Sequence, residues 1–219
     1  MEPESLAGVR RDAERIAKES GKAPSAQDWD LKGCAQQVRD SLNIEQGGLC
    51  AYCCGRVMPS PYDPGARTGM KVEHFVARSQ DPSLIYEWSN LLGVCGGRYM
   101  WGGEWVSSCD DSRGNAPLHI HPAQGNPDPE TAFRPTRDGR LEGTIDDATL
   151  DLKALNLNAE VHRRNRGAVI NMLQLKLARD DSTGNIKRLL ATATASPLPA
   201  YSFVAAWYLG MKLRCRGIT

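Results

Sequence analysis

The sequence predicts an α+β protein in which a short, cysteine-rich centre is framed by helices at both ends. Apolar residues recur at helical spacing up to residue 46 and again in the last third of the chain. Between these regions, short apolar runs at 71–76 and 91–95 fit strands, and Gly and Pro interrupt much of the remainder. We therefore divide the chain into an N-terminal helical segment (1–48), a central metal-binding core (49–122) and a C-terminal segment of loop, hairpin and helices (123–219).

The composition is that of an ordinary soluble protein. Of the 219 residues, 41% are hydrophobic and 24% are charged, and no apolar run is long enough to span a bilayer. The N-terminus has neither the basic start nor the apolar stretch of a signal peptide, so we expect a cytoplasmic protein with no membrane partner. In that reducing compartment, seven cysteines favour metal binding over disulfides.

The formal net charge is only +1, whereas a protein that binds nucleic acid unaided usually carries a broad basic surface. Either the basic patch is small and focused, or another protein holds the substrate.

Helices are predicted in both flanking segments. Residues 4–20 form an amphipathic pattern that ends at Gly21, and a second helix is expected over about 26–46, with Ser25 and Asp28 as its capped start. In the last third, apolar residues predict the buried faces of three further helices: Val161, Ala168, Val169, Met172 and Leu173; Ile186, Leu189, Leu190 and Ala193; and Phe203, Trp207 and Met211.

The centre reads as short strands and loops. We expect strands at 71–76, 91–95 and 117–121, and a tight turn at Asp138-Gly139. The Gly-rich segment 96–108 is expected to be irregular because of its paired glycines, and 122–135 is expected to be a proline-punctuated loop.

Four cysteines have the pattern of a structural zinc site. Cys50 and Cys53 form a Cys-x-x-Cys knuckle, and Cys95 and Cys109 are the natural second pair, although thirteen residues intervene between them. The four sulfurs converge if that intervening segment leaves and returns at the same point. Cys54 competes with Cys53 as a ligand, and the alternative to a zinc site is a set of unrelated buried thiols. Four protein ligands would leave no open coordination position for chemistry.

An acid–histidine pair lies between the cysteine pairs. Glu73-His74 is followed by Asn90 before an apolar run and then by Asp110, an order that resembles ββα-metal nucleases. His74 suits the general base that activates water, because imidazole titrates near neutrality. Glu73 and Asp110 suit Mg²⁺, which prefers carboxylates and retained waters, and Mn²⁺ can replace it. On a regular strand Glu73 and His74 point to opposite faces, so we expect the strand to end or bulge there.

Other residues receive supporting roles or stay open. Asn90 can bond backbone groups across the loop and fix His74, and Arg113 can hold a phosphate oxygen. Candidates whose roles the sequence leaves open are His119 and His121, which are either strand-surface or active-site residues; Trp101 and Trp105, which either stack on bases or pack beside the zinc; and Arg163, Arg164 and Arg166, which contact either solvent or nucleic acid.

Four motifs together resemble HNH endonucleases, and more narrowly the PtuB-type nucleases of Septu and retron-associated antiphage systems. They are Cys-Ala-Tyr-Cys at 50–53, Val-Glu-His-Phe at 72–75, Trp-Ser-Asn-Leu-Leu-Gly-Val-Cys at 88–95 and Cys-Asp-Asp-Ser-Arg-Gly at 109–114. The resemblance covers about residues 28–145. It departs from the family at Arg113, where Lys is usual, at Gly114, where some members place another ligand, and in the long segment between Cys95 and Cys109.

The resemblance implies a zinc-stabilised ββα-metal finger with His74 as general base, and with Glu73 and Asp110 as ligands of Mg²⁺. It also implies DNA as the favoured substrate, with RNA as the alternative, and a partner ATPase of the ABC/SMC-like type in antiphage defence. The apolar faces of the terminal helices are candidates for docking that partner. A different class of protein, a zinc ribbon that binds nucleic acid or protein without cleaving, remains the main alternative.

Overall fold

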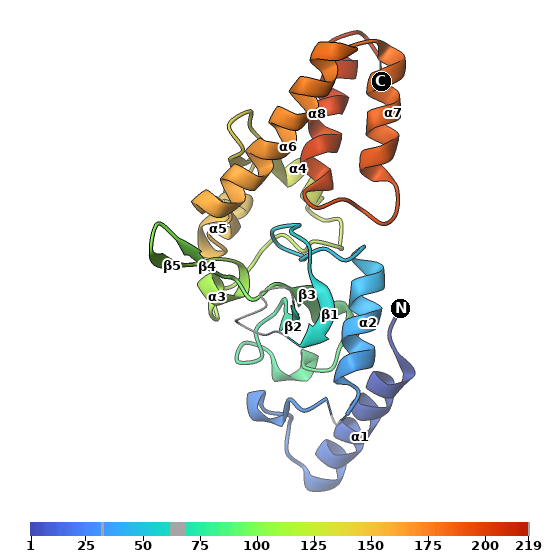
Figure 1. The fold of residues 1–219 in the computed structure, drawn as a ribbon. Coiled ribbons are helices and arrows are strands. Elements are labelled where there is room, and N and C mark those ends of the chain that lie inside the picture. Colours follow the sequence, from blue (N-terminus) through green and yellow to red (C-terminus); the bar gives the residue numbers. More distant parts are fainter. Residues whose placement is uncertain (32, 62–68, 219) are drawn as a thin grey trace.

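Helices and short strands fall in separate blocks along the chain, as the α+β class predicts. The computed structural model describes residues 1–31, 33–61 and 69–218. The N-terminal helices lie at one end, a small sheet lies in the middle, and the C-terminal helices form the other end (Figure 1). The described helices and strands support the α+β class at this level.

The N-terminal segment contains less helix than predicted. Helix α1 (Glu4–Ser20) buries Leu6 and Val9 and ends at Gly21 in the left-handed conformation, as expected. The second predicted helix is wrong in its first half. Ser25 and Asp28 do form a capping box, but they cap only the short turn η1 (Ala26–Asp28), and helix α2 (Ala35–Glu45) begins after Gly33, whose φ is +85°.

The central sheet consists of β1 (Met58–Pro61), β2 (Gly69–His74) and β3 (Leu91–Val94), hydrogen-bonded in that order. Strands β2 and β3 are antiparallel, with Lys71 opposite Val94 and His74 opposite Leu91. Both predicted strands are therefore confirmed to within two residues. Every residue of β3 is buried, which explains why the sequence shows it as a continuous apolar run.

The Gly-rich segment after β3 is a hairpin, and the prediction that it is irregular is wrong. Strands β4 (Arg98–Trp101) and β5 (Glu104–Ser107) pair antiparallel across Gly102-Gly103. Both glycines have positive φ, +59° and +86°. A two-residue hairpin turn with positive φ at both positions strongly favours Gly-Gly, so the glycines close the regular structure here.

The segment from 109 to 143 differs from its prediction in two places. Residues 117–121 form no strand, because the backbone N–H groups of His119 and Ile120 donate to the Asp151 carboxylate and not to a neighbouring strand. The loop expected at 122–135 contains α4 (Pro129–Ala132) and β6 (Phe133–Pro135). Helix α3 (Cys109–Arg113) precedes it, and β7 (Leu141–Gly143) pairs antiparallel with β6. The turn at Asp138-Gly139 is confirmed.

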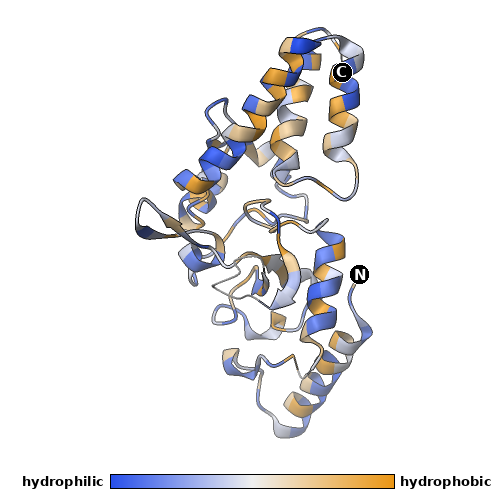
Figure 2. Ribbon diagram, in the orientation of Figure 1, coloured by the Kyte–Doolittle hydropathy of each residue, from blue (hydrophilic) through white to orange (hydrophobic). Residues whose placement is uncertain are grey.

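The C-terminal segment is helical, as predicted, but two buried faces differ from the predicted ones. Its helices are α5 (Asp146–Ala154), α6 (Glu160–Arg179), α7 (Thr183–Thr194) and α8 (Ser202–Arg214). The buried stripe of α6 consists of His162, Arg166, Ile170, Leu173 and Leu177. Two polar side chains occupy its first positions because they hydrogen-bond to the central core. Hydrophobic and hydrophilic residues alternate along this helix (Figure 2). On α8, Val204, Tyr208 and Leu209 are buried, and Phe203, Trp207 and Met211 lie at the edge of the core.

Two large apolar cores, and a small one formed by Ile120, Ala132 and Ala148, hold the described elements. The first large core contains residues of α1, α2, the sheet and α5, including Leu152, Leu155 and Leu157. The second contains α6, α7 and α8 from Ile170 onward, and the half-buried Phe203 contacts both large cores. The two large cores therefore meet at Phe203, and the boundary at 122/123 stays a prediction. None of the described helices is both long and apolar enough to cross a membrane.

Gly139 offers a test of how the β6–β7 hairpin docks on α6. A Cβ on Gly139 would lie 2.1 Å from the Arg163 carbonyl oxygen, and φ is +83°. Gly102 also has positive φ, but a Cβ there would meet nothing within 4 Å. We expect Gly102→Ala to cost about 1–2 kcal/mol of backbone strain, and Gly139→Ala to cost more because the helix must also move. Thermal unfolding of the two variants measures the difference, and equal midpoints would contradict the docking.

Candidate metal centre and active site

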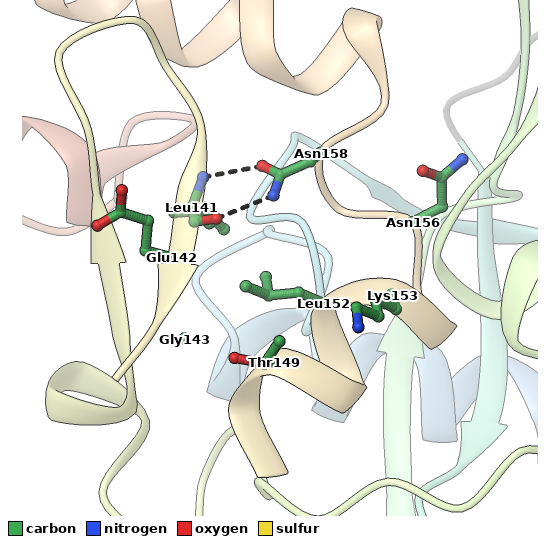
Figure 3. A pocket seen from close by; sticks show the side chains of 8 residues that line it. All are labelled: Leu141, Glu142, Gly143, Thr149, Leu152, Lys153, Asn156 and Asn158. Carbon is green, nitrogen blue, oxygen red and sulfur yellow. Dashed lines mark hydrogen bonds between the residues drawn. The ribbon is translucent and has the colours of Figure 1, made fainter. Parts of the chain in front are cut away.

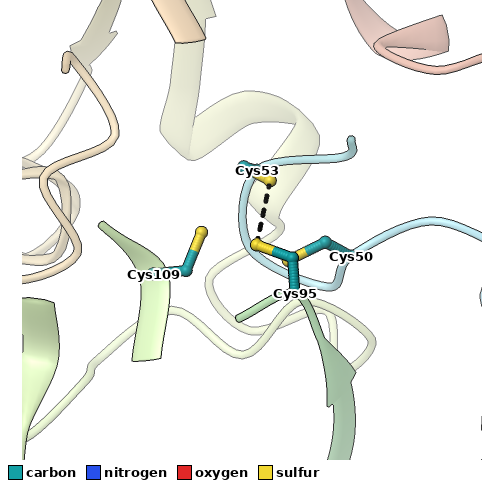
Figure 4. A group of neighbouring side chains, drawn as sticks. All are labelled: Cys50, Cys53, Cys95 and Cys109. Atoms are coloured by element: carbon teal, nitrogen blue, oxygen red, sulfur yellow. Dashed lines mark hydrogen bonds between the residues drawn. The ribbon is translucent and has the colours of Figure 1, made fainter. Parts of the chain in front are cut away.

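Four cysteine side chains converge at one buried point. Cys50 and Cys53 lie in the turn after α2, Cys95 follows β3, and Cys109 is the first residue of α3 (Figure 4). All four are buried, and their sulfur atoms lie within 4.8 Å of one another. Four thiolates at about 2.3 Å from a tetrahedral zinc ion would be separated by about 3.8 Å, and the Cys53–Cys95 sulfur distance is 3.9 Å. The cluster has the donor set and spacing to hold a zinc ion.

Local hydrogen bonds bring the four sulfurs together. In the knuckle, the Cys50 N–H donates to the Gly55 carbonyl (2.8 Å) and the Gly55 N–H donates to the Cys53 sulfur (3.4 Å). The β4–β5 hairpin returns the chain to its starting point, where the Ser108 N–H donates to the Gly97 carbonyl (2.7 Å). This return is what the long spacing between Cys95 and Cys109 required.

Cys53, and not Cys54, belongs to the cluster. Cys54 has a left-handed backbone (φ 57°), and its side chain is not among the converging four. Burial raises the pKa of the Cys54 thiol to about 12, so it stays protonated at neutral pH.

Side chains around the cluster supply hydrogen bonds that were not predicted. The Tyr99 hydroxyl lies 3.2 Å from the Cys95 sulfur, and the Ser108 hydroxyl donates to the Cys109 sulfur at 3.8 Å. His162 Nε2 lies 2.8 Å from the Ser108 oxygen, and its ring meets the Tyr99 ring edge-on at 5.2 Å. Outer contacts of this kind fix metal-ligating side chains. The one sequence signal for His162 is its place on the helical stripe that continues to Ile170 and Leu173.

The basic cluster on α6 is only partly exposed, which corrects one prediction. Arg166 is fully buried, with Nε donating to the Gly139 carbonyl (2.6 Å) and Nη2 to the Leu157 carbonyl (2.8 Å), so its assignment to nucleic acid is wrong. Arg163 and Arg164 both pair with Glu160 near the surface. Their contact with nucleic acid stays a prediction.

Two carboxyl groups meet between β2 and α3. Glu73 of β2 and Asp110 of α3 are in hydrogen-bonding contact, and the pKa of Glu73 is raised to about 8, first by burial and then by the charge of Asp110. Lys71 Nζ lies 3.1 Å from Asp110 Oδ2. The two half-buried acids each have a cation beside them, Lys71 for Asp110 and Arg113 for Glu73, and carboxylate oxygens are also the ligands that Mg²⁺ prefers.

Lys71 is a site residue that the sequence reasoning missed. It precedes Glu73 by two positions on the same strand, so both side chains leave β2 on the same face. That alternation was the available signal.

Arg113 is a brace and not a surface cation, so its predicted phosphate contact is wrong. Its side chain is 0% exposed. Nη1 donates to Glu73 Oε1 (2.6 Å) and to the His74 carbonyl (2.8 Å), while Nη2 donates to the Phe75 carbonyl (2.5 Å). Further bonds reach the Tyr52 hydroxyl and the Ala116 carbonyl. Arg113 thereby ties α3 to the end of β2 and orients Glu73.

His74 is buried and neutral. Its Nε2 lies 3.0 Å from the Ile85 carbonyl oxygen, and because that oxygen only accepts, Nε2 carries the proton and Nδ1 keeps its lone pair. Burial lowers the pKa of His74 to about 4. The Trp29 and His74 rings are nearly perpendicular, with centroids 4.4 Å apart.

Glu73 and His74 leave the strand on opposite faces. Regular pairing with β3 continues to His74, where β2 ends, so the structure has no bulge between the two residues.

Asn90 closes the loop that follows β2. Its Oδ1 accepts from the Val76 N–H (2.7 Å), and its Nδ2 donates to the Val76 and Leu84 carbonyls. Since Ile85 follows Leu84 directly, Asn90 fixes the segment whose carbonyl orients His74. This is the placement expected from the sequence.

The two histidines and two tryptophans whose roles the sequence leaves open have defined contacts in the structure. His121 uses both ring nitrogens within the protein, accepting from the N–H groups of Ala123 and Gln124 and donating to the Ser89 carbonyl. His119 donates through Nδ1 to Asp151 (2.9 Å). Trp101 stacks against the Arg164 guanidinium, and Trp105 is exposed.

A groove of about 510 Å³ lies apart from these groups, between β7, α5 and the turn after α5 (Figure 3). Its lining includes Thr149, Lys153 and Asn158, and the Asn158 amide bonds both backbone groups of Leu141. None of the predicted site residues lines it.

Comparison of the sequence with models of known protein families finds no match, and comparison with curated proteins finds none either. The site is therefore interpreted from its own geometry.

The buried position of Arg113 predicts a large loss of stability on its removal. In Arg113→Met, the Glu73 carboxylate loses its buried partner, and breaking such a pair from one side typically costs about 3–5 kcal/mol. Arg164→Met removes an arginine that is 66% exposed, and we expect little change. Chemical denaturation of both variants measures the contrast. Similar stability of the two variants would show that Arg113 is not a brace.

Proposed function

We propose that the protein is a metal-dependent endonuclease of the HNH kind that hydrolyses phosphodiester bonds of nucleic acid, with DNA favoured. The observation that carries the proposal is the Glu73–Asp110 carboxyl pair, which Arg113 braces at the end of the strand that bears His74. An antiparallel strand pair followed by a short helix supplies these residues in the order that the motifs led us to expect.

The four-cysteine cluster is proposed to hold a structural zinc ion. Its thiolates would complete a tetrahedral shell and leave no position for substrate. The ion would join the knuckle, the end of β3 and the start of α3, and so place Asp110 one residue beyond a fixed point.

His74 acts as the general base in this proposal. Nδ1 takes a proton from water, the water oxygen attacks phosphorus, and the bond from phosphorus to the leaving oxygen breaks. Glu73 and Asp110 would hold Mg²⁺, or Mn²⁺ in its place, which supplies charge stabilisation on the phosphate when bound. Asn90 keeps the Ile85 carbonyl in place and with it the tautomer of His74. Lys71 lies beside Asp110, where it can meet a phosphate oxygen.

The low positive charge of the protein favours a partner protein that holds the substrate. The chain carries a net charge of only +1, and two of the four arginines predicted to contact nucleic acid are buried. Phosphate neutralisation supplies most of the affinity for nucleic acid, so we expect the isolated protein to bind DNA weakly. We propose that an ABC/SMC-like ATPase presents the substrate in an antiphage system in the cytoplasm, with RNA as the alternative substrate.

A zinc-binding module without catalysis is the second candidate. It is favoured by the burial of His74, which is 5% exposed and covered by Trp29. It is also favoured by the strand geometry, since His74 leaves β2 on the face opposite Glu73.

The zinc proposal predicts one zinc per chain by elemental analysis. Cys109→Ser removes a ligand and should yield unfolded or aggregated protein, because ligands of structural zinc contribute folding free energy directly. Cys54→Ser is the matched control, since Cys54 lies outside the cluster, and it should keep the metal. A stable wild-type protein free of metal would refute the zinc site.

The catalytic proposal predicts that His74→Ala keeps its zinc and fold but loses cleavage of nucleic acid by about 10²–10⁴-fold. His119→Ala removes a histidine that is partly exposed and serves as the control. Cleavage is measured with excess protein at low salt, with Mg²⁺ or Mn²⁺, on DNA and RNA. Asp110→Asn should also raise the metal concentration needed for half-maximal rate. Equal cleavage by His74→Ala and wild type would favour the non-catalytic module.

A further inference from the structure

The β4–β5 hairpin projects from the side of the molecule with two different faces (Figure 1). Alternation along the strands places Tyr99 and Trp101 on one face. This face is attached to the protein: the Tyr99 hydroxyl contacts the Cys95 sulfur, and the Trp101 ring stacks on Arg164 at 4.6 Å. The hairpin is therefore held in place on its inner side.

The opposite face carries exposed apolar and cationic side chains. Met100 and Trp105 are direct cross-strand partners, and they are 44% and 53% exposed. The Arg98 guanidinium lies 5.4 Å from the centre of the Trp105 ring, and its side chain is 55% exposed. The result is a flat aromatic surface with a positive charge at its edge.

This surface lies close to the Glu73–Asp110 pair, because β5 leads directly into the helix that carries Asp110. Strand β5 leads into α3, so Trp105 lies five residues before Asp110 and at most roughly 18 Å from it along the chain. Ser107 donates a hydrogen bond to Asp111, and Arg98 lies 3.9 Å from the same carboxylate. Phosphates of one nucleic-acid strand are spaced about 3.4 Å apart along a duplex axis, so a base on Trp105 would lie within a few nucleotides of a phosphate at Asp110.

We propose that the outer face of this hairpin, formed by Arg98, Met100 and Trp105, stacks an unpaired base of the substrate strand. The inference rests on the proposed nuclease function. Base–aromatic stacking is tolerant of sequence, and a neighbouring arginine adds cation–π and phosphate attraction. Two exposed apolar side chains are too small a patch for a protein partner, which typically covers about 800 Å² on each side, but they match the size of one base.

The test is binding of fluorescently labelled single-stranded oligonucleotides without added divalent cation, so that no cleavage is needed. Trp105→Ala should weaken binding by roughly 5- to 150-fold, the factor that corresponds to loss of one stacked base. Trp105→Phe keeps an aromatic face and should retain most of the affinity. Met172→Ala, which removes a side chain that is also 44% exposed but lies on α6, should bind as wild type does.

An abasic oligonucleotide with the same number of phosphates separates stacking from charge. Wild type and Trp105→Ala should bind it equally, and DNA and RNA versions of the normal oligonucleotide should show the same dependence on Trp105. Unchanged affinity of Trp105→Ala, an equal loss on the abasic strand, or no binding by wild type would overturn the proposal. Absence of cleavage by wild type, or equal cleavage by wild type and His74→Ala, together with Trp105-dependent binding, would instead refute only the nuclease function.

Discussion

Four sulfur atoms from three separate stretches of chain meet at one buried point, and the centre of the molecule is organised around that meeting. In the described residues the central sheet has three short strands, about the smallest number at which a sheet with an apolar face is stable by itself. The cysteine cluster fixes where β3 ends, where the β4–β5 hairpin begins and returns, and where α3 starts. The acid pair depends on this constraint, since Asp110 follows Cys109 directly.

Buried polar side chains make most of the other contacts between helices, strands and turns. Arg113 connects α3 to β2, Arg166 connects α6 to the β6–β7 turn, and Asp151 connects α5 to the segment after α3. Each charge is placed among backbone groups that lack partners within a regular sheet or helix. Such contacts are directional, so they specify how elements meet where apolar surface is scarce.

The parts predictable from sequence are those with short-range signatures. The cysteine spacing, the apolar strand β3, the helical periodicities and the Asp138-Gly139 turn all express local geometry. The hairpin was missed because Gly-Gly both breaks regular elements and closes tight turns. Arg113 and Arg166 were misassigned because burial of a charge depends on distant backbone carbonyls that no local pattern records. Arg166 did leave a trace, since it repeats at helical spacing with His162 and Ile170.

The C-terminal bundle contacts the four-cysteine region through α6 and through the residue that precedes α8. The Tyr201 N–H donates to the Cys54 carbonyl at 2.8 Å, His162 Nε2 lies 2.8 Å from the Ser108 hydroxyl oxygen, Arg164 stacks on Trp101, and Phe203 contacts both cores. The bundle has its own core and extends well beyond these contacts (Figure 1). Because these contacts reach Cys54 and Ser108, a displacement of the bundle would act on the residues next to Cys53 and Cys109.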